Sequence, residues 1–281
     1  MVLNPAAGRG RAATAWPEIS RRLRFSGLQF DEAVTGRPGE AAVIAEKASG
    51  EYETIAAAGG DGTVHEVVNG LMRAGAKAVL RVIPLGSGDD FAKLLGSGNA
   101  IRSFDVGRIA SGAEVRYFAN GMDIGFGAHG AANVARVPRF LTGFGAYLGA
   151  LALTLIDYPQ LRVRLQLDDA PPFDLSTAMT AVMNGTTFGG SFQVCPDAKP
   201  DDGLLDLLLV DAVGRLEILR LVPKILKGTH AGDPRLRLMR ARRVRVESAE
   251  PLLVEADGEI AFMAAKQIEI ALLPRALRVF S

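Results

Sequence analysis

The stretch TIAAAGGDGTVHEVVNGL, residues 54–71, carries the strongest structural signal of this sequence. An apolar run ends at two glycines, and the apolar residues of VHEVVNGL then repeat at helical spacing. The stretch therefore predicts a buried strand at residues 54–58, a tight turn at residues 59–63 and a helix at residues 63–72. Thr63 is the expected N-cap of that helix, because its hydroxyl can accept a hydrogen bond from the first helical amides.

Strand-like and helical segments alternate around this stretch throughout the N-terminal third of the chain. The expected strands and helices are, in alternating order, residues 2–3, 12–23, 28–35, 38–48, 54–58, 63–72, 79–84 and 89–95. Alternation with short connections is typical of a parallel sheet that helices cover on both faces. We therefore expect a doubly wound α/β domain at residues 1–103, which residues 275–281 could rejoin.

Three turns that contain glycine lie at the expected carboxyl ends of these strands, where parallel sheets bind ligands. They are NPAAGRG at residues 4–10, GGDGT at residues 59–63 and PLGSGDD at residues 84–90. Glycine lets the backbone approach a ligand closely or take a positive φ, and the following helix attracts anions to its N-terminus. A carboxylate in a phosphate-binding loop needs a bridging cation, so Asp61 is a candidate Mg²⁺ ligand. The alternative is a plain strand-to-helix turn capped by Asp61.

A dinucleotide-binding site is another alternative. Residues 8–13 fit the pattern G-x-G-x-x-A, and Asp31 follows at about the spacing that such a site requires. However, Asn4 and Pro5 interrupt the strand before the glycines, and a dinucleotide fold does not account for the turn at residues 59–63. We therefore favour phosphate binding by the three turns together.

The pattern changes to successive strands in the rest of the chain. The expected strands are residues 104–109, 114–124, 161–167, 175–183, 204–210, 242–247, 252–255 and 268–272. Helices are expected only at residues 140–156 and 213–226. We predict a mostly antiparallel, β-sandwich-like domain at residues 104–281, with the active site in the cleft between the two domains. The uncharged run at residues 140–156 is shorter than the roughly 20 residues of a spanning helix, so we expect a partly buried helix that could touch lipid.

Composition and charge exclude several classes of protein. The 281 residues are 48% apolar and 22% charged with a net charge of +1, which excludes disorder and bulk attraction to nucleic acid. The single Cys195 cannot form an internal disulfide, so we expect a reducing, cytoplasmic setting. His65, His129 and His230 are expected to be structural or exposed to solvent. An arginine-rich segment at residues 235–245 could dock on anionic lipid, but a solvated strand face paired with acids is the favoured interpretation.

The three glycine turns also resemble a known family. In their order they are similar to the nucleotide-binding half of the diacylglycerol kinase-like lipid kinases, which include sphingosine kinases. The resemblance continues through the second domain, with Asn-Gly at residues 184–185, GGSFQVCPDAKPDDGLLDLLLV at residues 189–210 and Asp-Gly-Glu at residues 257–259. It departs from the family at Asp89, where an asparagine is usual, and at residues 96–99, where a helix usually follows.

The resemblance implies an ATP- and Mg²⁺-dependent kinase that transfers the γ-phosphoryl group to a lipid hydroxyl. The residues that it implies for holding the nucleotide are Asn4, Pro5, Ala6, Ala7, Gly8, Thr35, Gly59, Gly60, Asp61, Gly62, Thr63, Val64, His65 and Ser87. It also implies a second Mg²⁺ site in a loop, formed by the carboxylate of Asp202 and the backbone carbonyls of Lys199 and Leu204. An ordinary turn is the alternative for that loop.

The family places its proton acceptor in the acidic turn near the C-terminus. The resemblance therefore points to Glu259 as the base, with Asp257 beside it, and an alcohol acceptor does require a group that takes its proton. An Asp-Gly pair between two strands also predicts a plain hairpin. The sequence leaves open which of Asp61, Asp257 and Glu259 is the base and which serves the metal.

The expected partner is a lipid at the membrane surface, without nucleic acid and without a transmembrane span. We therefore expect the protein in the cytoplasm, peripheral to the membrane. The sequence does not decide whether it forms a homodimer. Diacylglycerol, phosphatidylglycerol, a sphingoid base and an isoprenoid alcohol are all candidate acceptors. The rival functions are a soluble kinase similar to NAD kinases and a nucleotide-binding regulator without turnover.

Overall fold

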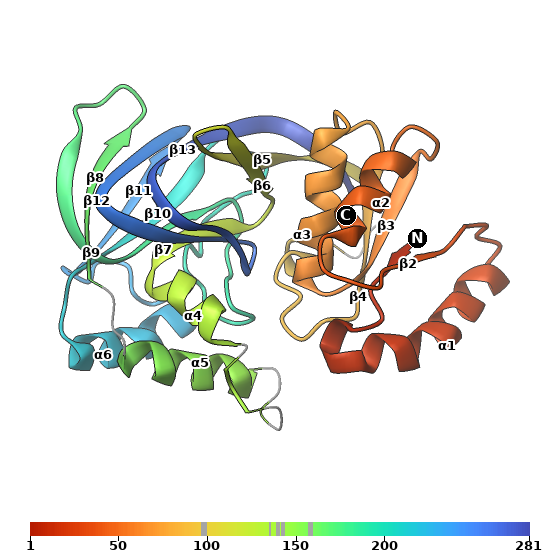
Figure 1. The fold of residues 1–281 in the computed structure, drawn as a ribbon, viewed down its shortest axis with the longest axis horizontal. Helices are drawn as coiled ribbons and strands as arrows, with labels where there is room; N and C mark the ends of the chain where they lie inside the picture. The colour runs from red at the N-terminus through yellow and green to blue at the C-terminus, as the bar shows by residue number, and fades with distance from the viewer. Residues whose placement is uncertain (97–99, 135, 139–140, 142–143, 157–159) are drawn as a thin grey trace. The chain divides into compact units, whose positions relative to one another are not determined.

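The computed structural model describes residues 1–281 except 97–99, 135, 139–140, 142–143 and 157–159. Its contacts divide the chain into two compact units. Unit 1 comprises Met1–Phe104 and Ala276–Ser281, and unit 2 comprises Asp105–Arg275. In Figure 1 most of unit 1 is red to orange, and unit 2 runs from yellow to blue.

Unit 1 contains a parallel sheet in the strand order β2-β1-β3-β4. Its strands are β1 (Val2–Leu3), β2 (Ala33–Val34), β3 (Thr54–Gly59) and β4 (Val79–Pro84). The last residues of β13 (Glu259–Phe280) add a further parallel neighbour, with Val279 opposite Leu80. This parallel pairing confirms the predicted α/β architecture. Short apolar strands that are buried on both faces suit a parallel sheet.

Helices cover both faces of this sheet. They are α1 (Arg11–Phe25), α2 (Glu40–Ala48) and α3 (Asp61–Arg73). Trp16 of α1 packs with Leu3 and Ala58 on one face. Helices α2 and α3 lie side by side (Figure 1), and the Glu66 carboxylate of α3 accepts the backbone N–H groups of Gly39 (2.7 Å) and Ala41 (2.9 Å). Glu66 thereby satisfies amides at the N-terminus of α2 that have no partner within the helix.

Two elements of unit 1 are shorter than the sequence predicts. The strand expected at residues 28–35 is reduced to β2, because β1 offers only two residues for pairing. The helix expected at residues 89–95 is the 3₁₀ turn η2 (Ala92–Leu94), which follows a residue with positive φ, Asp89 (φ 50°). The first turn holds a further 3₁₀ segment, η1 (Ala7–Gly10). The departure from the family that the sequence indicates at residues 96–99 falls mostly on residues 97–99, which lie outside the described residues.

Unit 2 is built from antiparallel strands, as predicted. They are β5 (Ile101–Ser111), β6 (Glu114–Phe118), β7 (Gly121–Gly125), β8 (Leu161–Leu167), β9 (Phe173–Met183), β10 (Leu205–Asp211), β11 (Leu236–Ala241), β12 (Arg243–Ala256) and most of β13. Strands β9 and β12 each pair with β7 at one end and with β8 at the other. The sheet therefore folds over a core that includes Ile124, Leu165, Leu207 and Val254.

The helices of unit 2 are α4 (Phe126–Val134), α5 (Phe144–Ile156) and α6 (Arg215–Leu226). Helix α4 is absent from the sequence expectations, because its segment FGAHGAANV contains two glycines and no apolar repeat. Part of the segment expected to begin α5 lies outside the described residues. The strand expected at residues 114–124 is divided into β6 and β7, whereas β12 continues through the predicted gap at residues 248–251 with shifts of register.

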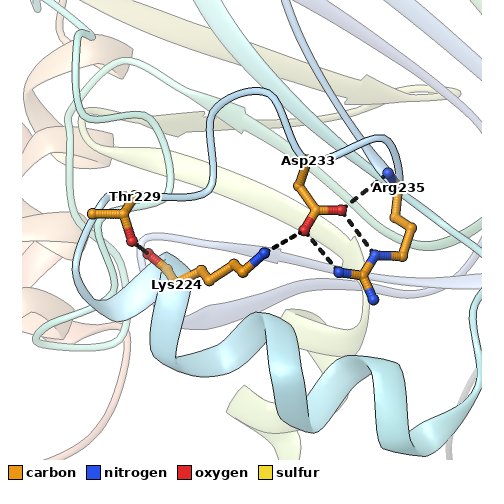
Figure 2. A network of polar contacts seen from close by, with 4 residues as sticks. All are labelled: Lys224, Thr229, Asp233 and Arg235. Atoms are coloured by element: carbon orange, nitrogen blue, oxygen red, sulfur yellow. Dashed lines mark hydrogen bonds and ion pairs between the residues drawn. The ribbon is translucent and has the colours of Figure 1, made fainter.

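The loop between α6 and β11 is closed by the buried carboxylate of Asp233 (Figure 2). It accepts hydrogen bonds from Lys224 Nζ (2.8 Å) and from Arg235 Nε and Nη2 (2.8 and 2.7 Å). These cations hold the pKa of Asp233 well below its usual range. His230 is buried in the same loop, where its Nε2 lies 3.0 Å from the Val194 carbonyl oxygen, so its role is structural.

Acidic partners neutralise much of the arginine-rich segment at residues 235–245. Ion pairs join Arg235 to Asp233, Arg237 to Asp211, Arg240 to Asp206, Arg243 to Asp169 and Arg245 to Glu247. The segment therefore behaves as a paired strand face rather than as an open basic patch. Within the described part of the chain, no helix is long and apolar enough to span a membrane.

Candidate active site

Asn4 connects the first glycine turn of unit 1 to the second. Its Nδ2 donates to Thr63 Oγ1 (3.1 Å), and its Oδ1 accepts from the backbone N–H of Ala6 (3.0 Å). Both ends of the amide are used, so the orientation of the side chain is fixed by its partners. The turn after β1 and the start of α3 are consequently held together at the carboxyl edge of the sheet.

Arg11 joins the first turn to the third. Its Nη2 donates to the Gly86 carbonyl oxygen (2.8 Å) and to Ser87 Oγ (3.3 Å), and its Nε donates to the Gly8 carbonyl oxygen (3.2 Å). Arg11 is not among the residues expected from the sequence. The signal that could have found it is a cation directly after a glycine-rich turn, within reach of backbone oxygens.

Asp61 joins the second turn to the third. It is the first residue of α3, and its Oδ1 accepts the backbone N–H of Phe91 (3.2 Å). The expectation that Thr63 is the N-cap was wrong, because the N-cap of α3 is Gly60. Thr63 lies one turn further in, is buried, and offers its hydroxyl to Asn4 instead.

The glycines of these turns allow the loops to approach one another. Gly60 has a φ of −98°, so no positive φ is required there. A Cβ placed on Gly60 would lie 3.0 Å from Gly86 Cα, and a Cβ on Gly86 would lie 2.5 Å from Gly60 Cα. Gly8 combines a φ of 58° with a Cβ position 2.7 Å from the Leu85 carbonyl oxygen. The close packing of these loops therefore leaves no room for a Cβ atom at Gly8, Gly60 and Gly86.

The remaining residues expected at the nucleotide lie along the same edge of the sheet. Thr35 follows β2, and its backbone N–H donates to the Leu3 carbonyl oxygen (2.9 Å). Val64 and His65 are buried in the first turns of α3. The His65 ring lies 3.3 Å from Asn69 Nδ2, so the histidine is held inside the unit.

Asp89 replaces the asparagine that is usual in the family, and the structure accommodates the change. Its Oδ1 accepts the backbone N–H of Gly86 (3.1 Å), and its φ of 50° is one that aspartate and asparagine tolerate. Burial raises the pKa of the Asp89 carboxyl. This shift favours the neutral form, which resembles an amide in charge.

Asp89→Asn is expected to keep ATP affinity and to increase stability at neutral pH. Because the folded state raises the pKa, ionisation of Asp89 opposes folding, and stability falls as pH rises through the folded pKa. The stability gained by the variant should disappear only well below the pKa of an unfolded aspartate, about 3.9, toward pH 2, where aspartate is protonated in both states. Urea unfolding of both proteins from pH 2 to pH 8 measures this difference, and an equal gain at every pH would contradict it.

In unit 2 the Asp-Gly pair forms the predicted hairpin and also carries the expected base. Ala256 pairs with Glu259, and the two residues between them have φ values of 50° and 90°, as in a type I′ turn. Asp257 anchors the turn to the segment between β6 and β7. Its carboxylate accepts the backbone N–H groups of Ala119 (3.0 Å), Asn120 (2.9 Å) and Gly121 (3.0 Å). Glu259, the next residue in the strand, is exposed.

The loop expected to hold a metal is organised by a buried carboxylate, Asp105. Its Oδ2 accepts the N–H of Gly203 (2.8 Å), and its own N–H donates to the Pro200 carbonyl oxygen (2.7 Å). Asp202 folds back so that its Oδ1 accepts the N–H of Leu204 (3.1 Å). One carboxylate and backbone carbonyls are hard oxygen donors, which suit Mg²⁺. The described residues contain no cluster of three or more His, Cys, Asp or Glu side chains with metal-binding geometry, so such a site needs the carbonyls.

Asn184 connects the segment around Asp105 to the segment at residues 119–121, which binds Asp257 of the hairpin. Its Nδ2 donates to the carbonyl oxygens of Asp105 (2.8 Å) and Ala119 (2.9 Å), and the residue is buried. The Asn-Gly motif therefore supports two parts of unit 2 through the backbone. No local sequence pattern indicates this role, because Asn184, Asp105 and Ala119 are far apart along the chain.

Residues 1–117 match the family model described as "Diacylglycerol kinase catalytic domain", and residues 119–281 match "YegS C-terminal NAD kinase beta sandwich-like domain". The chain belongs to the diacylglycerol kinase and YegS-like lipid kinase family. This assignment makes the protein a lipid kinase. The predicted β-sandwich-like second domain is confirmed by the same match.

Similar proteins cover nearly the whole lipid kinase chain. A "Probable lipid kinase YegS-like" of Pseudomonas aeruginosa is 31% identical over 91% of this chain and 86% of its own. A diacylglycerol kinase of Mycobacterium tuberculosis is 30% identical, with 99% and 93% covered. A crystal structure of a diacylglycerol kinase from Bacillus anthracis has the same fold, with a TM-score of 0.74 at 21% identity over 99% of this chain and 94% of its own.

Proposed function

We propose that this lipid kinase transfers the γ-phosphoryl group of ATP to a lipid hydroxyl in a Mg²⁺-dependent reaction. The observation that carries the proposal is the set of three glycine turns at the carboxyl edge of the unit 1 sheet. Hydrogen bonds of Asn4, Arg11 and Asp61 join these turns to one another. Phosphoryl transfer depends on positioning and on neutralising phosphate charge more than on covalent chemistry. Backbone N–H groups of these turns, beside the N-terminus of α3 and the positive end of its dipole, would suit both tasks.

Unit 1 would hold the nucleotide and unit 2 would supply the base. Asp61, the first residue of α3, would hold Mg²⁺, and the metal would supply neutralisation of the phosphate charge. Glu259 is the proposed proton acceptor, because it is an exposed carboxylate on a hairpin that the rest of unit 2 fixes in place. Asp257 serves as a positioning residue, since its carboxylate holds three backbone amides.

Incubation with ATP labelled at the γ-phosphate tests this function. The assay should contain membrane lipids extracted from cells in one arm and NAD in the other. We expect label in the lipid fraction, and the chemistry of the labelled lipid would identify the acceptor among diacylglycerol, phosphatidylglycerol, sphingoid bases and isoprenoid alcohols. Label in NAD would support the NAD kinase-like alternative, and ATP binding without transfer would support the regulator.

Asp202→Asn tests the loop metal. An ion bound to the folded state stabilises it by mass action, so the variant should lose more thermal stability in Mg²⁺ than in chelator. Asp211→Asn provides a control, because Asp211 is also an aspartate of unit 2 but is ion-paired with Arg237. Equal losses in both conditions for Asp202→Asn would show that the loop holds no ion.

One surface of unit 2 supports action at a membrane. Helix α5 contains no charged residue and exposes Leu148, Ala152 and Ile156, which recur at helical spacing. Helix α6 lies beside it (Figure 1) and exposes Leu216 and Leu219. We call this apolar surface the α5–α6 face. Exposed apolar stripes of this kind are characteristic of interfaces rather than of free surface.

Basic side chains border the α5–α6 face. Arg215 donates to the carbonyl oxygens of Leu155 (2.8 Å) and Ile156 (3.0 Å), which joins the start of α6 to the end of α5. Arg220 and Lys227 are exposed on or just after α6. An apolar stripe with a basic border fits the surface of an anionic bilayer.

Leu216→Glu combined with Leu219→Glu is expected to weaken binding to vesicles that contain anionic phospholipid. Burial of one leucine contributes about 1.5–3 kcal/mol, so the affinity should fall roughly ten-fold or more. Met263→Glu is the control, because Met263 is an exposed apolar residue of β13 outside this face. Sedimentation with vesicles measures the effect, and equal losses for both proteins would contradict the assignment of the face.

A further inference from the structure

Two acidic side chains are buried opposite each other in unit 2, and neither belongs to the residues assigned above to the reaction. Asp123 on β7 and Glu255 on β12 are direct partners in the antiparallel register. Their side chains therefore lie on the same face of the sheet, with Cβ atoms about 4.5–5.5 Å apart. Their exposed fractions are 1% and 0%. Two ionised carboxylates at such a site would repel each other without the hydration that offsets their charge.

The neighbouring strands supply no counter-charge. The register places Ala181 of β9 on the other side of Asp123, and Ile260 of β13 on the other side of Glu255. The residues before and after the two acids on their own strands point into the apolar core of the unit. The acids therefore depend on each other and on backbone groups.

The elements packed against the two acids add few charges. The titratable residue of α4 is His129, whose Nδ1 lies 2.9 Å from a backbone carbonyl oxygen of β7. Asp257 and Glu259 of the adjacent turn are acids themselves. Burial raises the pKa of Asp123 well above its usual value. Burial, then repulsion by Asp123, raises the pKa of Glu255 in the same way.

Each acid uses one oxygen for a backbone amide. Asp123 Oδ2 accepts the N–H of Ala128 in the first turn of α4 (2.7 Å). Glu255 Oε2 accepts the N–H of Gly258 in the hairpin turn (2.8 Å). The other two oxygens, Asp123 Oδ1 and Glu255 Oε1, are buried and have no hydrogen-bond partner among the described residues. One proton placed between these oxygens would satisfy both, whereas two ionised groups would leave both unsatisfied.

We propose that Asp123 and Glu255 share one proton and that the pair positions Glu259. The hydrogen bonds then form a continuous connection from the amide of Ala128, through Asp123 and Glu255, to the amide of Gly258. Gly258 directly precedes Glu259, so the pair ties the turn that carries the base to the N-terminus of α4. The positioning role rests on the proposed function of Glu259, whereas the shared proton does not.

Unfolding at different pH values tests the shared proton without any substrate. A carboxyl group whose pKa is raised by folding binds its proton more tightly in the folded protein, so stability falls as pH rises above about 4, the pKa in the unfolded chain. The double variant Asp123→Asn/Glu255→Gln keeps the shapes and a hydrogen-bond donor but has no proton to lose. We expect the fall in stability with rising pH to be smaller in this variant than in the wild type.

Asp233→Asn is a matched control for loss of a buried carboxyl group. The pKa of Asp233 is lowered by its cations, so its contribution to stability is lost as pH falls, the opposite direction. This variant should keep the wild-type fall in stability above pH 4. An identical fall in the wild type and in the double variant would overturn the shared proton. A fall that chelator abolishes would also overturn it, because a cation would then join the two acids.

Kinetics test the positioning role. Glu255→Ala removes the acceptor of the Gly258 amide and the link to Asp123, and we expect kcat to fall about ten- to hundred-fold with ATP affinity unchanged. Glu255→Gln should restore kcat, because glutamine can donate to Asp123 and accept from Gly258. Wild-type kcat in Glu255→Ala, in a protein that remains folded, would overturn the role. Failure of the lipid kinase function would instead appear as inactivity of the wild-type protein, with the unfolding result unchanged.

Discussion

Glu259→Gln is expected to lower turnover about 10²–10⁴-fold while ATP affinity stays the same. Glutamine preserves the size of the side chain and its hydrogen-bonding shape, but its amide cannot take the proton of the acceptor hydroxyl. The hairpin itself should be unaffected, because its turn is formed by Asp257 and Gly258 and anchored by Asp257. Initial rates at saturating ATP and lipid, together with calorimetry of ATP binding, measure the two effects.

Two further variants make the result specific. Asp61→Asn should weaken nucleotide binding or raise the Mg²⁺ requirement as well as lowering the rate, because its carboxylate is assigned to the metal and phosphates. Glu250→Gln is the matched control, since Glu250 is an exposed glutamate on the neighbouring strand β12. A wild-type rate for Glu259→Gln would reduce the turn to a structural hairpin and make Asp61 the leading candidate for the base.

Gly60→Val should abolish ATP binding. A Cβ at this position would lie 3.0 Å from Gly86 Cα, so the branched side chain of valine must push the second and third turns apart. The expected loss of stability is about 1–3 kcal/mol, which is typical of overpacking, so the protein should remain folded. Calorimetry of ATP binding and urea unfolding together separate the loss of the site from loss of the fold.

Gly50→Val is the control for this substitution. A Cβ at Gly50 meets no atom within 4 Å, and its φ lies outside the range that only glycine readily adopts. This variant should keep the ATP affinity of the wild type. If Gly60→Val also kept it, the second turn would not belong to the nucleotide site.

Local patterns predicted most of the fold. The strand, turn and helix of residues 54–71, the strand at residues 161–167 and the Asp-Gly hairpin follow from local patterns of apolar and turn residues, which the sequence shows directly. The predictions failed where a distant partner determines the element. Strand β2 is short because β1 is short, and β13 extends far beyond residues 268–272 because it pairs with strands of both units.

The sequence was sufficient to predict which residues belong to the candidate site, but not which partners they contact. The sequence indicated that Asp61 and Asp257 matter, yet their hydrogen bonds to Phe91 and to the segment at residues 119–121 join parts far apart in the chain. Arg11 was missed for the same reason. Asp123 and Glu255 are separated by more than a hundred residues, and only the register of β7 against β12 brings them together.

The most direct measurement counts two products in one reaction: ADP released and phosphate attached to lipid. A kinase that uses Glu259 to deprotonate the acceptor should form them in equal amounts, and Glu259→Gln should lower both together while ATP still binds. We expect this equality for the lipid identified by γ-phosphate labelling. ADP without phosphorylated lipid, or no transfer from bound ATP by the wild-type protein, would contradict it.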